Sequence, residues 1–481
     1  VQLTDNTATI SPTVSGNFTN GSWSGSVRIT KSQNDVKITA TGSQKTGSSN
    51  SFNVRANSLE RFRIATINTQ AAGEPFPLSV TALDQYNNVA SSFSGTVNIS
   101  DLTGTISPTT SGNFASGLWT GNVSVTSVRE DNRITVSDPA TSKNGESNLF
   151  DVISSDVDHF VISNISSPQT AGIPFQITIT AQDRDNNTAT NFTGTVSLTD
   201  ITATLEPTST PNFTAGVWTG NVKITKARVN NKITATALGK AGVSNEFTVI
   251  HGYLDRFVIE SIPSPQVAGN PFLVKITAKD SMDNTVNNFT SYVNLSDNTN
   301  TISPQVSGNF TTGQWSGNIQ VTKSHPSVVI TASRFNSTGV SNSFWVKPNS
   351  VNYLKITDAA GGKGQEVGSR TLSLDEKLKL YASGFDSFNN YVRDVTANWG
   401  VTGELDAPSP LIGEWTEFDP QSPGTSGEIY ADSLSLQADT TGTITVGSIS
   451  FVKIRTAPGG QGVELTDITI TADDSLELFC A

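Results

Sequence analysis

The 481-residue chain carries 42 Asp and Glu against 30 Lys and Arg, a net charge of −12. Residues 353–481 hold 19 of the acids and 8 of the bases, whereas the first 352 residues hold 23 and 22. This distribution argues against nucleic-acid binding, which needs a basic face. The single cysteine, Cys480, and the three histidines exclude a disulfide framework and make a Cys/His zinc site implausible.

The only methionine is Met282, so Val1 is not a translational start. The sequence contains no signal peptide and no apolar run long enough to span a membrane. We therefore expect these residues to be part of a longer polypeptide, with its targeting and anchoring segments outside the sequence.

One tryptophan motif, Gly-x-Trp-x-Gly, recurs about once every hundred residues. It begins at Gly21, Gly117, Gly216 and Gly313, and a shorter echo, Gly-Glu-Trp-Thr, begins at Gly413. The tryptophans of these five segments are 96, 99, 97 and 100 residues apart. A fixed period of this length indicates a string of similar modules, each of the size of a sandwich domain.

The repeat at 157–253 shows the strands that we expect in each module. The alternation of apolar and polar residues in 176–182 predicts a strand with one buried face, and further short strands are predicted at 160–162, 192–200, 216–225, 232–237 and 244–250. Loops rich in Gly, Pro and Asn separate these strands. About seven strands in some 97 residues fit an immunoglobulin-like sandwich.

Two loops recur with the strands and set the module boundaries. An Ala-Gly-x-Pro-Phe loop occupies 72–76, 171–175 and 268–272, and an acidic-amide turn occupies 84–88, 183–187, 280–284 and 386–390. Residues 1–5 align with 196–200, in the middle of a repeat. We therefore predict the C-terminal part of a module at 1–58, full modules at 59–156, 157–253 and 254–351, a divergent acidic module at 352–449, and the N-terminal part of a further module at 450–481.

The order of these motifs resembles the bacterial Ig-like modules of invasin/intimin-type surface proteins. The resemblance covers the whole chain, with residues 352–481 more similar to a related bacterial class that has a Val-Thr-Ala-x-Trp strand, here at 395–399. It implies an all-β fold, a tandem array of immunoglobulin-like β-sandwich modules forming an elongated rod. Such modules serve as spacers, adhesin shafts, surface-layer parts and enzyme appendages.

The repeated tryptophan has two interpretations. It could form a platform on which a sugar ring stacks, or it could fill the sandwich core between two bends made by glycines. Its fixed place in every module favours the core.

The acidic-amide turn is the most informative polar feature. In such a sandwich, the loop after the second strand lies at the pole that faces the preceding module, near the linker acids Glu60, Asp158 and Asp255. Oxygen ligands at a module junction suit calcium. The alternative is an Asx turn that bonds only nearby backbone. The candidate calcium ligands are Asp84, Asn87, Asp183, Asp185, Asp280, Asp283 and Asp386.

Catalysis finds little support in the sequence. The histidines, His159, His251 and His325, do not recur at an equivalent position, and no Gly-x-Ser-x-Gly elbow occurs. We therefore expect a non-enzymatic extracellular structural protein at the cell surface, a shaft or the subunit of a filament or layer. Its expected partners are further copies or neighbouring surface proteins. The alternatives are an adhesin region that binds carbohydrate or a receptor, and an accessory region of a large secreted enzyme.

Overall fold

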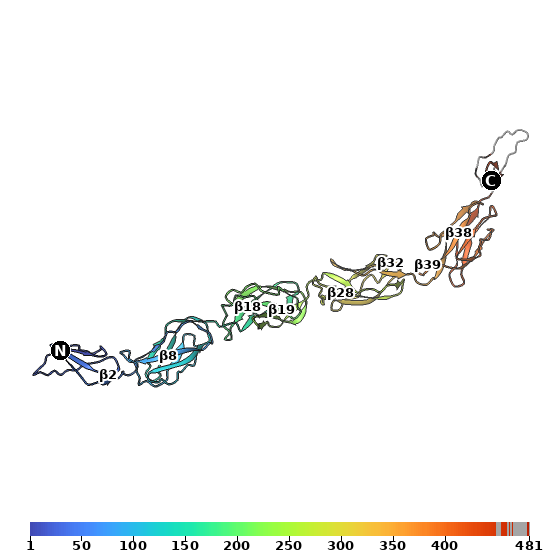
Figure 1. Cartoon of the computed structure of the whole chain (residues 1–481). Coiled ribbons are helices and arrows are strands. Elements are labelled where there is room, and N and C mark those ends of the chain that lie inside the picture. Colours follow the sequence, from blue (N-terminus) through green and yellow to red (C-terminus); the bar gives the residue numbers. More distant parts are fainter. Residues whose placement is uncertain (449–453, 459–460, 462–463, 465–478, 481) are drawn as a thin grey trace, which may run out of the picture. The chain divides into compact units, whose positions relative to one another are not determined.

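The computed structural model describes residues 1–448, 454–458, 461, 464 and 479–480. It falls into two compact units, Val1–Ile250 and His251–Ala481. All regular elements of the described residues are β-strands (Figure 1). Within this part of the chain, nothing has the helical length and apolarity that a membrane crossing requires.

Residues 157–250 show the arrangement that the neighbouring repeats share. A four-stranded sheet orders β16-β18-β21-β20, and two three-stranded sheets order β19-β23-β24 and β17-β25-β22. Only the pair β17–β25 is parallel. The bounds are β16 (His159–Ile162), β17 (Gln169–Thr170), β18 (Phe175–Gln182), β19 (Ser197–Asp200), β20 (Leu205–Glu206), β21 (Val217–Ile224), β22 (Arg228–Asn231), β23 (Ile233–Ala237), β24 (Lys240–Val243) and β25 (Phe247–Ile250).

These sheets form the two faces of one sandwich. A single residue separates β22 from β23 and three separate β24 from β25, so each pair runs as one interrupted strand. One face of the sandwich is the four-stranded sheet. In the opposite face, the interrupted strand β22–β23 lies in the middle, paired with β19 on one side and with the interrupted strand β24–β25 on the other. This is the immunoglobulin-like strand order, and the fold class predicted from the sequence is confirmed.

Alternating side chains build the core between these faces. In β18, Ile177 and Ile179 are buried, while Thr178 lies on the outer face and shares a 2.9 Å hydrogen bond with Thr219 of β21. Each isoleucine buried in this way contributes about 1.5–3 kcal/mol of hydrophobic stabilisation. Phe160, Phe192 and Phe213 add edge-to-face ring contacts to the same core.

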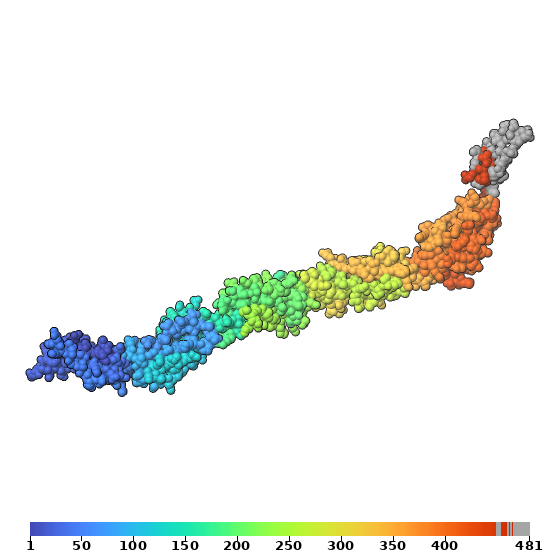
Figure 2. Space-filling model, viewed as in Figure 1, coloured from blue at the N-terminus to red at the C-terminus, as the bar shows by residue number. Residues whose placement is uncertain are grey.

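The repeats on either side follow the same plan, each around its own core. In the space-filling view, the residues of one repeat stay together as an unbroken block of colour (Figure 2). The strands of residues 59–153 are β6 (Arg61–Ile64), β7 (Gln70–Ala71), β8 (Phe76–Leu83), β9 (Asn98–Asp101), β10 (Ile106–Ser107), β11 (Leu118–Val125), β12 (Arg129–Asn132), β13 (Ile134–Ser137), β14 (Asn144–Glu146) and β15 (Phe150–Ile153). Those of 254–347 are β26 (Arg256–Ile259), β27 (Gln266–Val267), β28 (Phe272–Lys279), β29 (Asn294–Asp297), β30 (Ile302–Ser303), β31 (Gln314–Val321), β32 (His325–Val328), β33 (Ile330–Arg334), β34 (Ser337–Val340) and β35 (Phe344–Lys347).

Residues 1–58 contain a three-stranded sheet, β1-β3-β4, and a two-stranded sheet, β2-β5. Phe18 is 49% exposed, whereas its equivalent Phe114 in the next repeat is 3% exposed. The difference arises because Phe114 packs against Phe62 of β6, and residues 1–58 contain no strand in that place. The bounds are β1 (Gln2–Asp5), β2 (Gln33–Val36), β3 (Ile38–Gly42), β4 (Lys45–Ser48) and β5 (Phe52–Val54).

Residues 352–448 form a variant sandwich around a separate core. Its sheets order β36-β38-β39 with β42 on β38, β37-β46-β43, and β41-β40-β44-β45. Most of the predicted module at 450–481 lies outside the described residues. The bounds are β36 (Tyr353–Thr357), β37 (Arg370–Leu372), β38 (Leu378–Phe385), β39 (Tyr391–Asp394), β40 (Ala397–Val401), β41 (Ile412–Gly413), β42 (Trp415–Phe418), β43 (Ser426–Gly427), β44 (Ile429–Asp432), β45 (Asp439–Thr440), β46 (Ile444–Val446), β47 (Ile454–Arg455) and β48 (Phe479–Cys480).

The predicted strand at 192–200 was too long. Only β19 (Ser197–Asp200) forms. Residues 190–191 lie in a turn, in which the N–H of Phe192 donates to the carbonyl of Ala189, and residues 192–196 follow as irregular backbone. Here the chain passes from one sheet of the sandwich to the other, and Phe192 is buried in the core between them.

In the modules at 59–153 and 157–250, the repeated tryptophan lies inside the sandwich, as predicted. Trp119 and Trp218 are only 9% and 8% exposed. The prediction that the second glycine of the motif makes a bend was wrong. Gly121 pairs regularly within β11, and a β-carbon there would lie 2.4 Å from Cζ2 of Trp119. This glycine is needed because the indole covers its position.

Trp415 contradicts the prediction that five tryptophans occupy one equivalent core position. In β42 it is Thr416 that is fully buried, whereas Trp415 is 41% exposed. The N–H of Ala382 bonds the carbonyl of Glu414, whereas the equivalent Ala181 bonds that of Gly216. Trp415 is therefore one residue out of register with Trp218, and a shift of one residue moves a strand side chain to the other face.

Candidate functional site at the module junctions

The turn 183–187 after β18 folds around the carboxylate of Asp183. This side chain is buried, and its Oδ1 accepts hydrogen bonds from the N–H groups of Asp185 (3.0 Å) and Asn187 (2.9 Å). Asn186 has the left-handed φ of 67° that the turn requires and that asparagine tolerates. We call this five-residue unit, with its equivalents at 84–88, 280–284 and 386–390, the junction turn.

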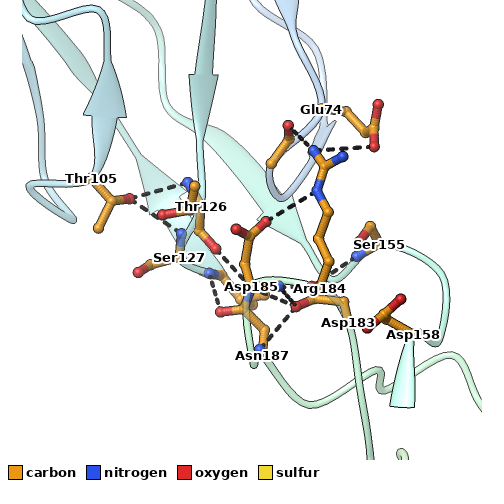
Figure 3. Close-up of polar contacts among 12 residues, drawn as sticks. Glu74, Thr105, Thr126, Ser127, Ser155, Asp158, Asp183, Arg184, Asp185 and Asn187 are labelled. Atoms are coloured by element: carbon orange, nitrogen blue, oxygen red, sulfur yellow. Dashed lines mark hydrogen bonds and ion pairs between the residues drawn. The ribbon is translucent and has the colours of Figure 1, made fainter.

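Asn187, the last residue of the junction turn, bonds the preceding module. Its Nδ2 donates to the carbonyl of Thr126 (2.7 Å), and its Oδ1 accepts from the N–H of Val128 (3.3 Å). The Oδ2 of Asp183 accepts from the linker N–H of Ser155 (3.2 Å). Figure 3 shows the carboxylate and the amide side by side, joined to one another and to both sides of the junction.

The same contacts recur at the other junctions within each compact unit. Asn88 bonds the carbonyl of Thr30 (2.7 Å) and the N–H of Ser32 (2.8 Å), and Asp84 accepts from the linker N–H of Asn57 (2.9 Å). In the second unit, the same roles are taken by Asn390 with Thr322 and Ser324 (2.7 and 2.8 Å), by Asp386 with the N–H of Asn349 (2.9 Å), and by Asp280 with the N–H of Gly252 (2.6 Å). The turns 84–88, 183–187 and 386–390 therefore lie at the pole that faces the preceding module, as predicted.

A second repeated carboxylate shapes the surface that receives the turn. Asp101 accepts hydrogen bonds from the N–H and hydroxyl groups of Thr103, and the Thr103 hydroxyl contacts that of Thr105 at 2.6 Å. Oγ1 of Thr105 then accepts from the N–H groups of Thr126 and Ser127, beside the carbonyl that Asn187 uses (Figure 3). Sequence reasoning missed this network, although the pattern Asp-x-Thr-x-Thr was visible at 5–9, 101–105, 200–204 and 297–301.

The second and third residues of the junction turn pack against the Ala-Gly-x-Pro-Phe loop of the preceding module. Arg184 donates to the carbonyl of Gly73 and lies 3.4 Å from the Glu74 carboxylate. A β-carbon on Gly269 would lie 2.1 Å from Cε2 of Phe388. Glycine is required in this loop because the next module's turn packs directly against its backbone. The two motifs singled out in the sequence thus meet at the junction.

Hydrogen bonding favours the ionised form of Asp84, Asp280 and Asp386. Burial by itself raises the pKa of Asp84, Asp280 and Asp386, but N–H donors outweigh it, first among them the side-chain amide of the last asparagine. The pKa of each carboxyl is therefore below its ordinary value of 3.8. A negative charge that accepts several N–H bonds is stabilised without a metal ion.

The candidate calcium ligands divide into two groups. Asp84, Asp183, Asp280 and Asp386 are buried and accept the N–H bonds of their turns. The other candidates contact arginine side chains. Asn87 accepts a hydrogen bond from Arg61, the carboxylate of Asp185 lies 3.6 Å from Arg184, and that of Asp283 lies 3.0 Å from Arg256. Calcium binding at these turns stays a prediction.

The linker acids lie beside the turns, as predicted, because the N–H groups of Glu60, Asp158 and Asp255 donate to the carbonyls of Leu83, Gln182 and Lys279, each the residue before a turn aspartate. Their carboxylates pair with lysine or arginine side chains, Glu60 with Lys143 (2.8 Å), Asp158 with Lys240 (3.1 Å) and Asp255 with Arg256 (3.0 Å). Arg256 also contacts Asp283 of the junction turn at 3.0 Å, so at this junction one cation bridges the linker acid and the turn. Among the described residues, no group of three or more His, Cys, Asp and Glu side chains is placed to hold a metal ion.

Sequence reasoning missed the residue that makes the contact between modules. The candidate set included Asn87 but not Asn88, and the last residues of the other turns were also left out. The signal was present, because an asparagine ends all four turns whereas the residue before it varies between Asn and Asp.

Comparison with family models gives no match, and comparison with curated proteins gives none either. Solved structures do match. The Escherichia coli adhesin FdeC is 15% identical, with 62% of this chain and all of the other covered and a TM-score of 0.31. Invasin, a bacterial integrin-binding protein, is 11% identical, with 80% and 79% covered and a TM-score of 0.29. The surface layer protein SbsC, domains 1–6, is 15% identical, with 84% and 56% covered and a TM-score of 0.22.

Proposed function

We propose that the chain is a non-enzymatic structural segment of an extracellular surface protein, in which joined modules form a shaft or the subunit of a filament or layer. The observation that carries the proposal is the recurrence of one hydrogen-bonded junction. Asn88, Asn187 and Asn390 each bond a backbone carbonyl and a backbone N–H of the module before them.

The junction restricts how one module turns against the next. Two amide bonds and the linker N–H bond to the aspartate contribute about 1 kcal/mol each. Modules joined only by a flexible linker would otherwise change their relative orientation freely. A contact that recurs at three junctions with the same residue types suits a spacer or an assembly subunit, because it sets the same relation between each pair of joined modules.

Immunogold electron microscopy of the producing cells would test this proposal, with antibodies raised against the chain. We expect labelling on intact cells, along appendages or across a surface layer, with the label reaching the chain without permeabilisation. Labelling that appears only after permeabilisation would contradict the extracellular location. Unlabelled cells, with the chain found only in the medium as part of a freely diffusing enzyme, would contradict the structural role.

A further inference from the structure

The variant sandwich at 352–448 carries aromatic side chains on an outer sheet face. In β38, Leu378, Leu380 and Ala382 point into the core, so Lys379, Tyr381 and Phe385 lie on the opposite side. Tyr381 is directly opposite Trp415 of β42, and Phe385 is directly opposite Tyr353 of β36.

Two pairs of rings lie on this side of the sheet, separated by Ser383 and Thr357, which are buried and share a 2.9 Å hydrogen bond. Tyr353 and Phe385 are stacked, with centroids 5.9 Å apart and planes at 20°. The pair Tyr381–Trp415 lies four residues along β38, about 13 Å away at ~3.3 Å per residue. Nζ of Lys379 lies 4.2 Å from the centroid of the Trp415 ring and holds the indole on one side, while 41% of Trp415 stays exposed.

In the full repeats of residues 59–347, the equivalent face carries no Phe, Tyr or Trp side chain, although single aliphatic residues such as Leu118 and Leu273 are exposed there. In residues 157–250 it carries Thr178 and Thr219, which bond one another through their hydroxyl groups. The tryptophan of those repeats is inside the sandwich, and only the one-residue shift in β42 brings Trp415 to the surface. A feature confined to one module is what distinguishes a binding surface from a part of the repeated scaffold.

The chemistry of the face favours a neutral polysaccharide. Sugar rings have apolar C–H faces that pack on aromatic rings and hydroxyl edges that need hydrogen-bonding partners. Here the rings alternate with polar groups: Lys379 is directly opposite Glu417, and the Tyr353 hydroxyl donates to Asn389. A protein–protein interface of ordinary size has a broader apolar centre than two pairs of rings provide.

Charge decides against an anionic ligand. Residues 352–448 hold 14 Asp and Glu against 6 Lys and Arg, so a polyanion or an anionic membrane would be repelled. The Lys379 ammonium group contacts the rings of Trp415 and Tyr381, and it can donate an N–H that points away from these rings to a sugar hydroxyl. We propose that the outer face of β36, β38 and β42, centred on Trp415 and Tyr381, binds an uncharged polysaccharide. This proposal does not depend on the structural role proposed above.

Affinity electrophoresis of the full 481-residue chain would test this site. The gels would contain hydroxyethylcellulose, glucomannan or soluble xylan, with a polymer-free gel as reference and polygalacturonate as the charged comparator. We expect retardation in at least one neutral polymer. The Trp415→Ala change should weaken the binding about tenfold, because one ring contact is lost.

Two further variants distinguish loss of the ring at the site from a general effect of removing an exposed ring. Trp415→Phe retains a ring and should keep most of the binding, and Tyr430→Ala removes an exposed ring from the opposite sheet of the same sandwich and should leave the binding unchanged. Circular dichroism would confirm that each variant is folded. The proposal is overturned if none of the three neutral polymers retards the chain, if only polygalacturonate does, or if Trp415→Ala and Tyr430→Ala behave alike.

Discussion

At the scale of single residues, the junction turn separates two tasks that its sequence places side by side. The first aspartate shapes the turn and fixes the linker, and the last asparagine bonds the preceding module. Asn187 suits this task because a carboxamide donates and accepts at once, matching the carbonyl of Thr126 and the N–H of Val128. A carboxylate in the same place would leave the carbonyl without a donor.

Replacing Asn187 with Ala should loosen the junction between residues 59–153 and 157–250. Two hydrogen bonds are lost, so the free energy of local opening should fall by about 1–3 kcal/mol. Hydrogen exchange followed by mass spectrometry would measure this at the amide of Val128 and at the linker amide of Ser155. Asn186→Gly is the matched control, because glycine adopts the left-handed backbone of that position and should leave the exchange unchanged. Equal exchange in both variants would show that the amide does not hold the junction.

The lowered pKa of Asp386 predicts a dependence of the junction on pH. A carboxyl whose pKa is lower in the folded than in the unfolded state stabilises the fold fully above its ordinary value of 3.8, and this contribution is lost as the pH falls toward the folded pKa. We therefore expect protection of the Asn349 amide to decline below about pH 4. Asp386→Asn does not titrate, so its protection should be weaker throughout and flat across the same pH range. A decline that persists in this variant would assign the pH dependence to another group.

At the scale of elements, the tryptophan strand shows how one residue of register changes a side chain's role. Trp218 is packed over Gly220 inside the sandwich, where a β-carbon on the glycine would lie 2.3 Å from Cζ2 of the indole. In the variant module, Thr416 takes the inner position and donates its hydroxyl to the carbonyl of Pro410. Trp399 of β40 is buried instead, and its Nε1 donates to the carbonyl of Gly413.

Two alanine substitutions should therefore differ greatly in effect despite their similar local sequences. Trp218→Ala removes a buried indole and should lower the free energy of opening of β21 by about 3–5 kcal/mol. Trp415→Ala removes an exposed indole and should cost β42 less than about 1 kcal/mol. Hydrogen exchange of the two strands in the full chain gives both numbers. Similar losses would mean that Trp415 is as deeply packed as Trp218, contrary to its 41% exposure.

At the scale of the whole molecule, the hydrogen bonds that the junction turns share make a prediction about calcium binding. The buried carboxylates of the turns accept N–H bonds, and calcium could bind them only by displacing these donors. Extracellular calcium modules bind at about 10⁻⁴–10⁻³ M, so the ion would have to be tested at such concentrations.

Addition of calcium to the chelator-treated chain should leave its thermal unfolding unchanged if the N–H donors satisfy the carboxylates. Differential scanning calorimetry with and without calcium would check this, and magnesium would serve as the control for ionic strength. A rise of the unfolding temperature with calcium alone would instead support the ligand set predicted from the sequence, and the junction turns would then be metal sites.

The sequence by itself determined the repeat, the all-β fold and the place of the junction turn, because period, alternation and turn residues are local properties of the chain. It could not show which atoms of the turn meet the preceding module. Asn187 and Thr126 are 61 residues apart, and only the packing of successive sandwiches brings them together. Tertiary structure likewise decided which face Trp415 occupies, because the pairing of β42 with β38 sets the register, and a strand side chain changes sides with each residue.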